Sequence, residues 1–231
     1  MLKFNLSQLQ KKAYHEIVIN WKILTFGIIC PLLIFSILAW QVCQADKGFS
    51  WDIFILLKIH DTAQPFLDKT AKNITKLGNF EGIMGLLMPI ILLLIYQKRR
   101  RYLAYLIITI LGNTILNIMT KMLFHRVRPY LWESLYYRPQ DFSFPSGHAM
   151  GSMTLVIALL MLTWGTQWRF LVAIFGSLFV LLIAWTRLYL GVHFPSDILG
   201  GWILAIPWTI GMSLLFNLRQ LKSNQDVKPS K

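Results

Sequence analysis

The sequence contains a histidine and an aspartate, His193 and Asp197, at a spacing that allows them to act together. An imidazole is a good nucleophile when one ring nitrogen is bare and aimed at its target. A nearby carboxylate can hold the hydrogen of the other nitrogen and stabilise the cation that forms. Arg187, shortly before His193, adds a planar fork of donors that matches phosphate oxygens. This segment therefore indicates nucleophilic chemistry on an anionic group.

A second polar cluster runs from Lys121 to Pro129. If a helix continues through it, Lys121, His125 and Arg128 fall at positions i, i+4 and i+7 and share one face. Two cations on one face would form an anion site, and Pro129 predicts that the chain turns there. The alternative interpretation is an ordinary basic flank of a membrane segment.

A third cluster, Pro145 to His148, stands directly before an apolar stretch. Ser146 is a natural N-cap, and the free backbone N–H groups at a helix start attract an anion. Gly147 permits close approach of the backbone to a ligand, and His148 can exchange a proton near neutral pH. The alternative is a capped helix that happens to carry an interfacial histidine.

A zinc site competes with the anion site, and its ligands would be His125, His148, His193 and Asp197. The same surface would carry three fixed cations, Lys121, Arg128 and Arg187. These charges repel a divalent ion, whereas zinc sites prefer compact sets of histidine, cysteine and carboxylate ligands. We therefore predict that the protein uses no metal and no other cofactor.

The composition points to a bilayer. Of the 231 residues 55% are hydrophobic and only 14% are charged, and the mean hydropathy is +0.53. In soluble domains about a quarter of the residues are charged. The formal net charge of +13 could suggest nucleic acid. No recognition motif is present and the charges stand at the ends of apolar runs, so we predict no nucleic-acid partner.

The apolar residues group into six stretches, near Ile23–Val42, Gly82–Tyr96, Ala104–Met119, Ala149–Trp164, Phe170–Thr186 and Leu199–Phe216. The predicted fold is an all-α, polytopic membrane helix bundle with about six transmembrane helices. We expect a cytoplasmic segment over 1–22, a single transmembrane domain over 23–218 and a cytoplasmic tail over 219–231. Gly82–Tyr96 is the shortest stretch and contains Pro89, so it could instead be tilted or partly interfacial.

The distribution of basic residues predicts the orientation. With the N-terminus in the cytoplasm, the inner side carries thirteen of the 23 Lys and Arg residues but only two of the ten acids. The three polar clusters then all lie on the outer side of a cell membrane. Between residues 44 and 81 apolar and charged residues alternate, which fits either a helix lying at the interface or a solvated loop.

Together the clusters resemble the motifs of the type 2 phosphatidic acid phosphatase (PAP2) family, which shares its active site with vanadium-dependent haloperoxidases. The family motifs are Lys, six residues, Arg-Pro; then Pro-Ser-Gly-His; then Ser-Arg, five residues, His, three residues, Asp. This sequence fills them, in chain order, with Lys121 through Arg128-Pro129, with Pro145 to His148, and with Thr186-Arg187, His193 and Asp197. One departure is Thr186, which keeps the hydroxyl of the usual serine.

The resemblance implies a role for each motif residue. His193 would attack phosphorus to form a phosphohistidine, with Asp197 orienting and stabilising it. His148 would protonate the leaving oxygen and then activate water. The phosphoryl oxygens would be held by Lys121, Arg128, Ser146, Gly147 and Arg187.

The function implied is that of a membrane phosphatase acting on a lipid phosphate or pyrophosphate, with the bilayer and its lipid as partners. The resemblance suggests undecaprenyl pyrophosphate, phosphatidylglycerol phosphate or phosphatidic acid as the substrate. Two alternatives remain open: a phosphotransferase that uses the same intermediate, and a non-catalytic lipid-binding protein that keeps the fold. The sequence does not define an oligomeric state.

Overall fold

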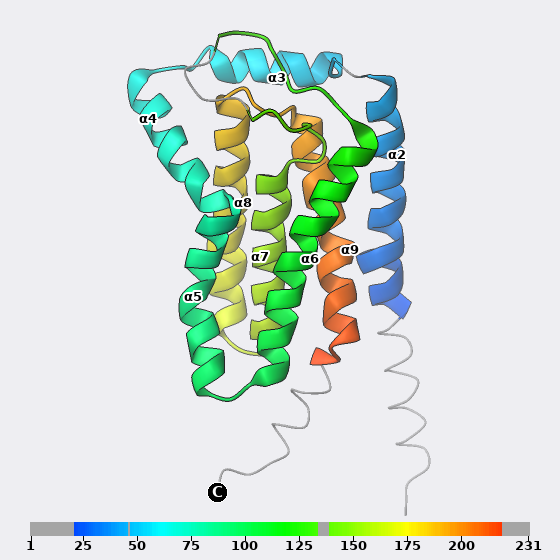
Figure 1. Ribbon diagram of the computed structural model, residues 1–231, viewed down its shortest axis with the longest axis vertical. Coiled ribbons are helices and arrows are strands. Elements are labelled where there is room, and N and C mark those ends of the chain that lie inside the picture. The colour runs from blue at the N-terminus through cyan, green and yellow to red at the C-terminus, as the bar shows by residue number, and fades with distance from the viewer. Residues whose placement is uncertain (1–20, 46, 134–138, 219–231) are drawn as a thin grey trace, which may run out of the picture.

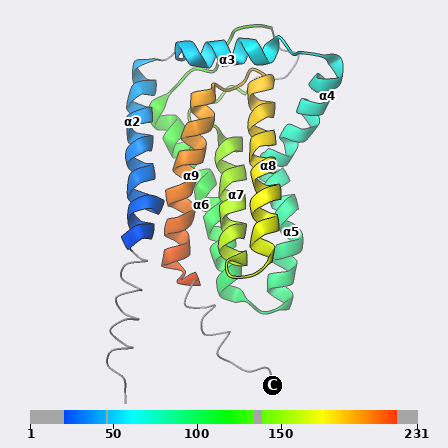
Figure 2. The same ribbon diagram turned by 180° about the vertical axis from the view of Figure 1, so that it is seen from behind.

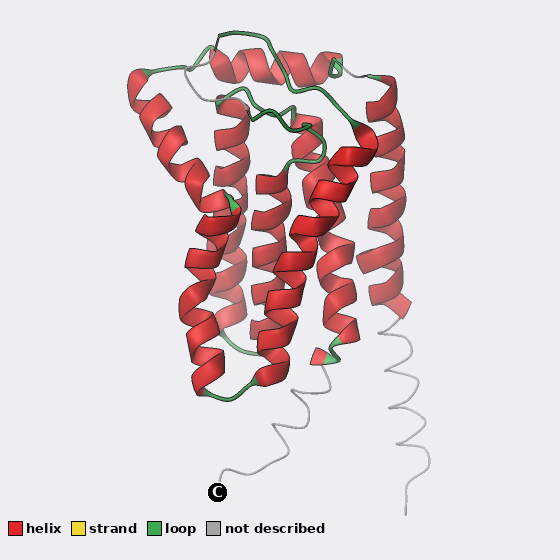
Figure 3. Ribbon diagram, viewed as in Figure 1, coloured by secondary structure: helices red, strands yellow, loops and turns green. Residues whose placement is uncertain are grey.

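The computed structural model describes residues 21–45, 47–133 and 139–218. Apart from Trp21 and Lys22, the predicted cytoplasmic segments 1–22 and 219–231 lie outside these residues. The regular elements, all helical in this part of the chain (Figure 3), are in order η1 (Ile23–Ile29), α2 (Cys30–Gln44), α3 (Ser50–His60), α4 (Pro65–Ile74), η2 (Thr75–Gly78), α5 (Phe80–Tyr96), α6 (Arg100–Phe124), α7 (Gly147–Thr163), α8 (Trp168–Tyr189) and α9 (Pro195–Leu215). The all-α prediction is confirmed.

Each of the six apolar stretches lies in a helix, and the chain is a multi-pass membrane protein. Four helices are long and apolar enough to cross a bilayer, namely Ile23–Gln44, α6, α8 and α9. The pair Pro65–Gly78 and Phe80–Tyr96, bent by 59°, can form a fifth, broken span. The predicted count of six is therefore approximate, because α7 has only 17 residues, or about 25 Å.

The short helix α7 lies at the centre of the bundle, where it packs against α6, α8 and α9. Its N-terminus starts below the neighbouring ends of α8 and α9 (Figure 1). The recess leaves room at this end of the bundle for the loops that carry the polar clusters. Large apolar side chains such as Leu123 and Phe175 point outward and are 71% and 66% exposed, as expected for helix faces that meet lipid.

Helix α3 lies across the same end of the bundle, roughly perpendicular to the other helices (Figures 1 and 2). Asp52 and Leu56 of this helix are fully buried, whereas Trp51, Phe54 and Leu57 are exposed. The solvated-loop interpretation is therefore wrong for residues 50–60, which form a helix with an apolar outer side. The described chain begins and ends at the opposite end of the bundle, near the α5–α6 turn.

Glycine allows α9 to pack closely against the start of α7. A Cβ atom added at Gly201 would lie 2.8 Å from the carbonyl oxygen of Ser146 and 3.1 Å from the amide nitrogen of Met150. Both atoms are backbone, so they cannot move aside as the end of a side chain would. At Gly211, in the same helix, nothing lies within 4 Å of an added Cβ.

We predict that Gly201→Ala destabilises the protein by about 1–3 kcal/mol, because the methyl group overpacks a backbone contact. Gly211→Ala is the matched control and should be neutral or slightly stabilising, since alanine is the better helix former. Thermal unfolding of both variants in detergent, followed by tryptophan fluorescence, measures the difference. Equal melting temperatures would contradict the packing argument.

Candidate active site

The connection between α6 and α7 and the connection between α8 and α9 meet at the end of the bundle that α3 crosses, and the bend between α4 and α5 lies deeper in the bundle (Figure 1). The predicted site residues are brought together here. His125, which was a ligand only in the competing zinc interpretation, does not join them. Helix α6 ends at Phe124, and His125 has a left-handed backbone with φ of 51° and an exposed side chain.

The prediction of one continuous helical face through Lys121, His125 and Arg128 is therefore wrong. His125 turns outward and its ring packs edge-on against Phe142, with the centroids 4.5 Å apart. Arg128 instead reaches the site from the irregular segment that follows α6. A zinc site made of His125, His148, His193 and Asp197 is not assembled in this arrangement, and the absence of a metal stays a prediction.

His193 and Asp197 form the centre of the site. The carboxylate oxygen Oδ2 of Asp197 lies 3.3 Å from Nδ1 of His193 and accepts a hydrogen bond of 2.9 Å from the backbone N–H of Phe194. Asp197 is the third residue of α9, so this capping bond turns its carboxylate back toward the residue before the helix. Local helix geometry thus positions the pair.

The tautomer of His193 follows from its second contact. Nε2 of His193 lies 3.0 Å from NH1 of Arg128, and a guanidinium has only donors to offer. Nε2 must therefore be the bare, accepting nitrogen, and Nδ1 carries the hydrogen that faces Asp197. Burial, and then the charges of Arg128, Arg187 and Lys121, hold the pKa of His193 well below its ordinary value. The ring is neutral at neutral pH, as a nucleophile requires.

Two of the predicted cations are joined by a residue that the sequence analysis missed, Asp141. One carboxylate oxygen contacts Nζ of Lys121, and the other accepts a hydrogen bond of 2.7 Å from NH2 of Arg128. Burial raises the pKa of Asp141, but Lys121 and Arg128 outweigh this and the pKa lies below its ordinary value. The carboxylate is charged and fills the position expected for an anion. Its only signal in the sequence is its place as the last acid before Pro145.

Arg187 approaches from α8 and is 1% exposed. Its NH1 donates a hydrogen bond of 2.8 Å to the hydroxyl of Thr75 in η2. Thr75 was also missed, since an isolated threonine in a mixed segment gives no signal. The contact ties the bend between α4 and α5 to the site.

Ser146, Gly147 and His148 begin α7 as predicted, with Ser146 at the N-cap. The Ser146 hydroxyl makes no side-chain capping bond, and this buried oxygen has no hydrogen-bond partner among the described residues. It is therefore available to a ligand. A Cβ atom on Gly147 would lie 3.0 Å from Oδ1 of Asn117, which shows how closely α6 approaches this turn.

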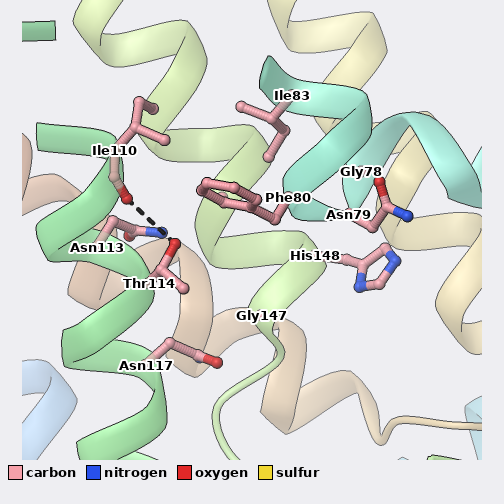
Figure 4. A pocket seen from close by; sticks show the side chains of 11 residues that line it. Gly78, Asn79, Phe80, Ile83, Ile110, Asn113, Thr114, Asn117, Gly147 and His148 are labelled. Atoms are coloured by element: carbon pink, nitrogen blue, oxygen red, sulfur yellow. Dashed lines mark hydrogen bonds between the residues drawn. The ribbon is translucent and has the colours of Figure 1, made fainter. Parts of the chain in front are cut away.

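His148 lines a cavity of about 170 Å³ between α5, α6 and α7 (Figure 4). Phe80, Ile83 and Ile110 supply apolar walls, and Asn113 and Asn117 of α6 lie across from the imidazole. Asn117 also donates a hydrogen bond of 3.1 Å to the carbonyl of Pro145. The cavity thus lies between the helices and is bounded on one side by Gly147 and His148, the first residues of α7.

The arrangement defines a class of protein. It is a helical membrane protein that has, at one end of its bundle, a buried histidine as candidate nucleophile and a cluster of cations suited to an anion. Residues 101–221 match the PAP2 superfamily, and the chain belongs to it.

Relatives within this superfamily include named phosphatases. The chain is 28% identical to an undecaprenyl-diphosphatase of Sulfolobus acidocaldarius over 206 residues, which are 85% of this chain and 92% of the relative. It is 31% identical to phosphatidylglycerophosphatase B of Bacillus subtilis over 152 residues, 62% of this chain and 72% of the relative.

Two solved structures have similar folds. One is the crystal structure of a transmembrane PAP2 type phosphatidylglycerolphosphate phosphatase from Bacillus subtilis, with a TM-score of 0.65, 25% identity and coverage of 89% of this chain and 100% of that chain. The other is Aquifex aeolicus LpxE, with a TM-score of 0.58, 27% identity and coverage of 72% and 96%.

We predict that Asp141→Asn binds inorganic phosphate about three- to tenfold more tightly than the wild type, because the competing carboxylate charge is removed from Lys121 and Arg128. Calorimetry on the purified protein in detergent measures the affinity. Glu133→Gln, at an exposed acid of the same loop, is the matched control and should leave it unchanged. Weaker phosphate binding by Asp141→Asn would contradict the prediction and show that the part Asp141 plays in holding the two cations outweighs its competition with phosphate.

Proposed function

We propose that the protein is an integral membrane lipid phosphatase that hydrolyses a lipid phosphate or diphosphate through a phosphohistidine on His193. The observation that carries the proposal is the placement of the His193 ring, with Nδ1 facing Asp197 and Nε2 facing Arg128. A nucleophile held in this way beside a cluster of cations suits a phosphoryl group better than any other common target.

In the first step the substrate phosphoryl group replaces the Asp141 carboxylate as the partner of Lys121 and Arg128. Nε2 of His193 attacks phosphorus, and the bond from phosphorus to the lipid oxygen breaks as the N–P bond forms. The imidazole becomes a cation, which the Asp197 carboxylate stabilises through Nδ1–H. The negative charge of the bound phosphate favours protonation of His148, and a protonated His148 gives its proton to the leaving oxygen.

In the second step water replaces the departed lipid. His148, now neutral, takes a proton from that water, and the oxygen attacks phosphorus as the N–P bond breaks. Inorganic phosphate leaves and His193 returns to its neutral form. Arg187, the Ser146 hydroxyl and the Gly147 N–H are suited to hold the phosphoryl oxygens during both steps, because donors fixed in advance stabilise the developing charge.

A lipid substrate is supported by the cavity that ends at His148. Its apolar walls come from helices α5 and α6, so the apolar part of a lipid could stay within the bundle while the phosphate meets the cations. The names of the relatives suggest undecaprenyl pyrophosphate and phosphatidylglycerol phosphate, and phosphatidic acid is the third candidate. Turnover of the three lipids, compared side by side on the purified protein, separates them.

The site is proposed to face the extracytoplasmic side. Lys98 and Arg99 stand in the α5–α6 turn and Arg100 and Arg101 begin α6, at the end of the bundle opposite α3. Basic residues in a short loop favour the cytoplasmic side of a membrane. The two ends of the described chain lie at this same end, so both termini are proposed to be cytoplasmic.

We predict that His193→Ala lowers lipid-phosphate release by at least about a thousandfold, because no other side chain replaces the nucleophile. His125→Ala is the matched control, since His125 belongs to a neighbouring loop but turns outward, and it should keep wild-type activity. Phosphate release is measured in the presence of a chelator, and the acid-labile, base-stable label of a phosphohistidine is sought with radioactive substrate. Activity of His193→Ala equal to that of the wild type would contradict the proposal. Activity that requires added metal would contradict the metal-free mechanism.

We also predict that His193 of the substrate-free protein stays neutral below pH ~6.5, the ordinary pKa of histidine. Burial and the cations Arg128, Arg187 and Lys121 depress its pKa, so the ring gains a proton only at more acidic pH. Nuclear magnetic resonance titration of labelled histidine in detergent micelles, with His193→Gln for assignment, measures this. A His193 resonance that titrates at or above the ordinary value would contradict the stated electrostatics.

A further inference from the structure

A buried ionic cluster beneath α3 is not used by the mechanism above. It consists of Arg126, Asp52 and Ser196 together with Asp197, and none of the four is exposed. They come from three separate parts of the chain: α3, the loop after α6 and the first turn of α9. Neither Arg126 nor Asp52 belongs to the three motifs, and neither has a role so far.

Arg126 uses its planar fork to reach both carboxylates. NH1 donates to Oδ1 of Asp197 at 2.5 Å and to the Ser196 hydroxyl at 2.8 Å, and NH2 donates to Oδ2 of Asp52 at 3.1 Å. The guanidinium also lies over the Phe194 ring, with its central carbon 4.5 Å from the ring centroid. Packing and hydrogen bonds together hold it in one orientation.

Asp52 is equally fixed. Its Oδ1 accepts a hydrogen bond of 2.9 Å from the backbone N–H of Ser196, and its Oδ2 accepts one of 2.6 Å from the Ser196 hydroxyl. Oδ2 also accepts a bond of 3.1 Å from the backbone N–H of Phe49. The carboxylate therefore joins the start of α3 to the start of α9.

The two oxygens of Asp197 have different partners as a result. Oδ1 is bonded to Arg126, whereas Oδ2 faces His193 and the backbone N–H of Phe194. Rotation of the carboxylate would break the bond to Arg126. Because Arg126 holds Oδ1, it also fixes the position of Oδ2, the oxygen that faces His193.

Charge gives the cluster a second effect. One guanidinium lies between two carboxylates, so the cluster carries a net charge of about −1 with Arg126 protonated. The attraction within a buried ion pair is largely cancelled by the free energy that its desolvation costs, so a contribution to stability does not by itself explain this cluster. This charge lies on the Nδ1 side of His193, where Asp197 contacts the ring. The cations Lys121, Arg128 and Arg187 and the imidazole of His148 also act on His193, and the Asp141 carboxylate is bonded to Lys121 and Arg128.

We propose that Arg126 and Asp52 are positioning residues for the nucleophile: they orient Asp197 toward Nδ1 of His193 and set the negative charge that His193 experiences. The inference rests on the proposed role of His193. It makes helix α3, which lies across the end of the bundle, a part of the catalytic apparatus through Asp52.

The two residues affect His193 with opposite sign. Arg126→Gln leaves two carboxylates without their cation, which favours protonation of His193, so the acid limb of kcat/KM should move to higher pH by about one unit. Asp52→Asn leaves Arg126 to neutralise Asp197 alone, so the limb should move to lower pH. The double variant restores the net charge, and its limb should return close to that of the wild type.

The experiment measures kcat and KM against pH for the three variants in detergent micelles, with Arg101→Gln, at an exposed arginine near the opposite end, as control. The ionisation of the substrate is common to all of them and cancels in the comparison. Arg126→Gln and the double variant should also lose about 10- to 100-fold in kcat with little change in KM, because Asp197 is no longer held.

Equal acid limbs in all variants would overturn the inference and leave the cluster a structural role. Shifts of opposite sign for Arg126→Gln and Asp52→Asn would support it, and Asp52→Asn, which is nearly isosteric, keeps the test available if Arg126→Gln does not fold. Failure of the proposed function looks different, because the wild type itself would then release no phosphate.

Discussion

The buried carboxylate of Asp197 is the interaction on which the rest of the site depends. A charge removed from water is tolerated only when it is paired and hydrogen-bonded. Asp197 meets this condition with the guanidinium of Arg126 and the backbone N–H of Phe194. The loop after α6 must therefore reach the first turn of α9, and α3 must lie over both, because Asp52 holds Arg126 from the other side. The arrangement of one end of the bundle follows from one ion.

The bilayer explains why these polar groups gather where they do. Exposed faces of the long helices are apolar, so the polar side chains can be satisfied only inside the bundle or at its end. Helix α7 is short, and its recessed start places Ser146 and His148 below the ends of its neighbours, where α3 and the loops surround them. The bend at η2 is possible for the same reason: Thr75 and Gly78 are buried there, and Thr75 accepts a hydrogen bond from Arg187.

Local signals explain what could be predicted from the sequence. Apolar runs predict helices because backbone groups in lipid must be bonded within the segment, and each of the six runs lies in a helix. His193 and Asp197 were found because one helical turn brings them together. Asp52 and Arg126 were not, because their partners are 74 and 71 residues away, and in the sequence both resemble ordinary interfacial charges. The end of α6 was missed because His125, a residue other than glycine, adopts the left-handed conformation that ends the helix, and no glycine or proline stands at that position to indicate it.

Asp141 bears on how the cations are prepared for their ligand. Lys121 and Arg128 come from different segments, and in the absence of a counter-ion their mutual repulsion would push them apart. The carboxylate of Asp141 holds them at a spacing that one anion can bridge, with Arg128 beside Nε2 of His193. A phosphoryl group that takes this place brings more negative charge and a further oxygen, so it can outcompete the carboxylate without any change in the cations themselves. Donors fixed in this way need no reorganisation at the moment of reaction, which is how electrostatic stabilisation lowers a barrier most effectively.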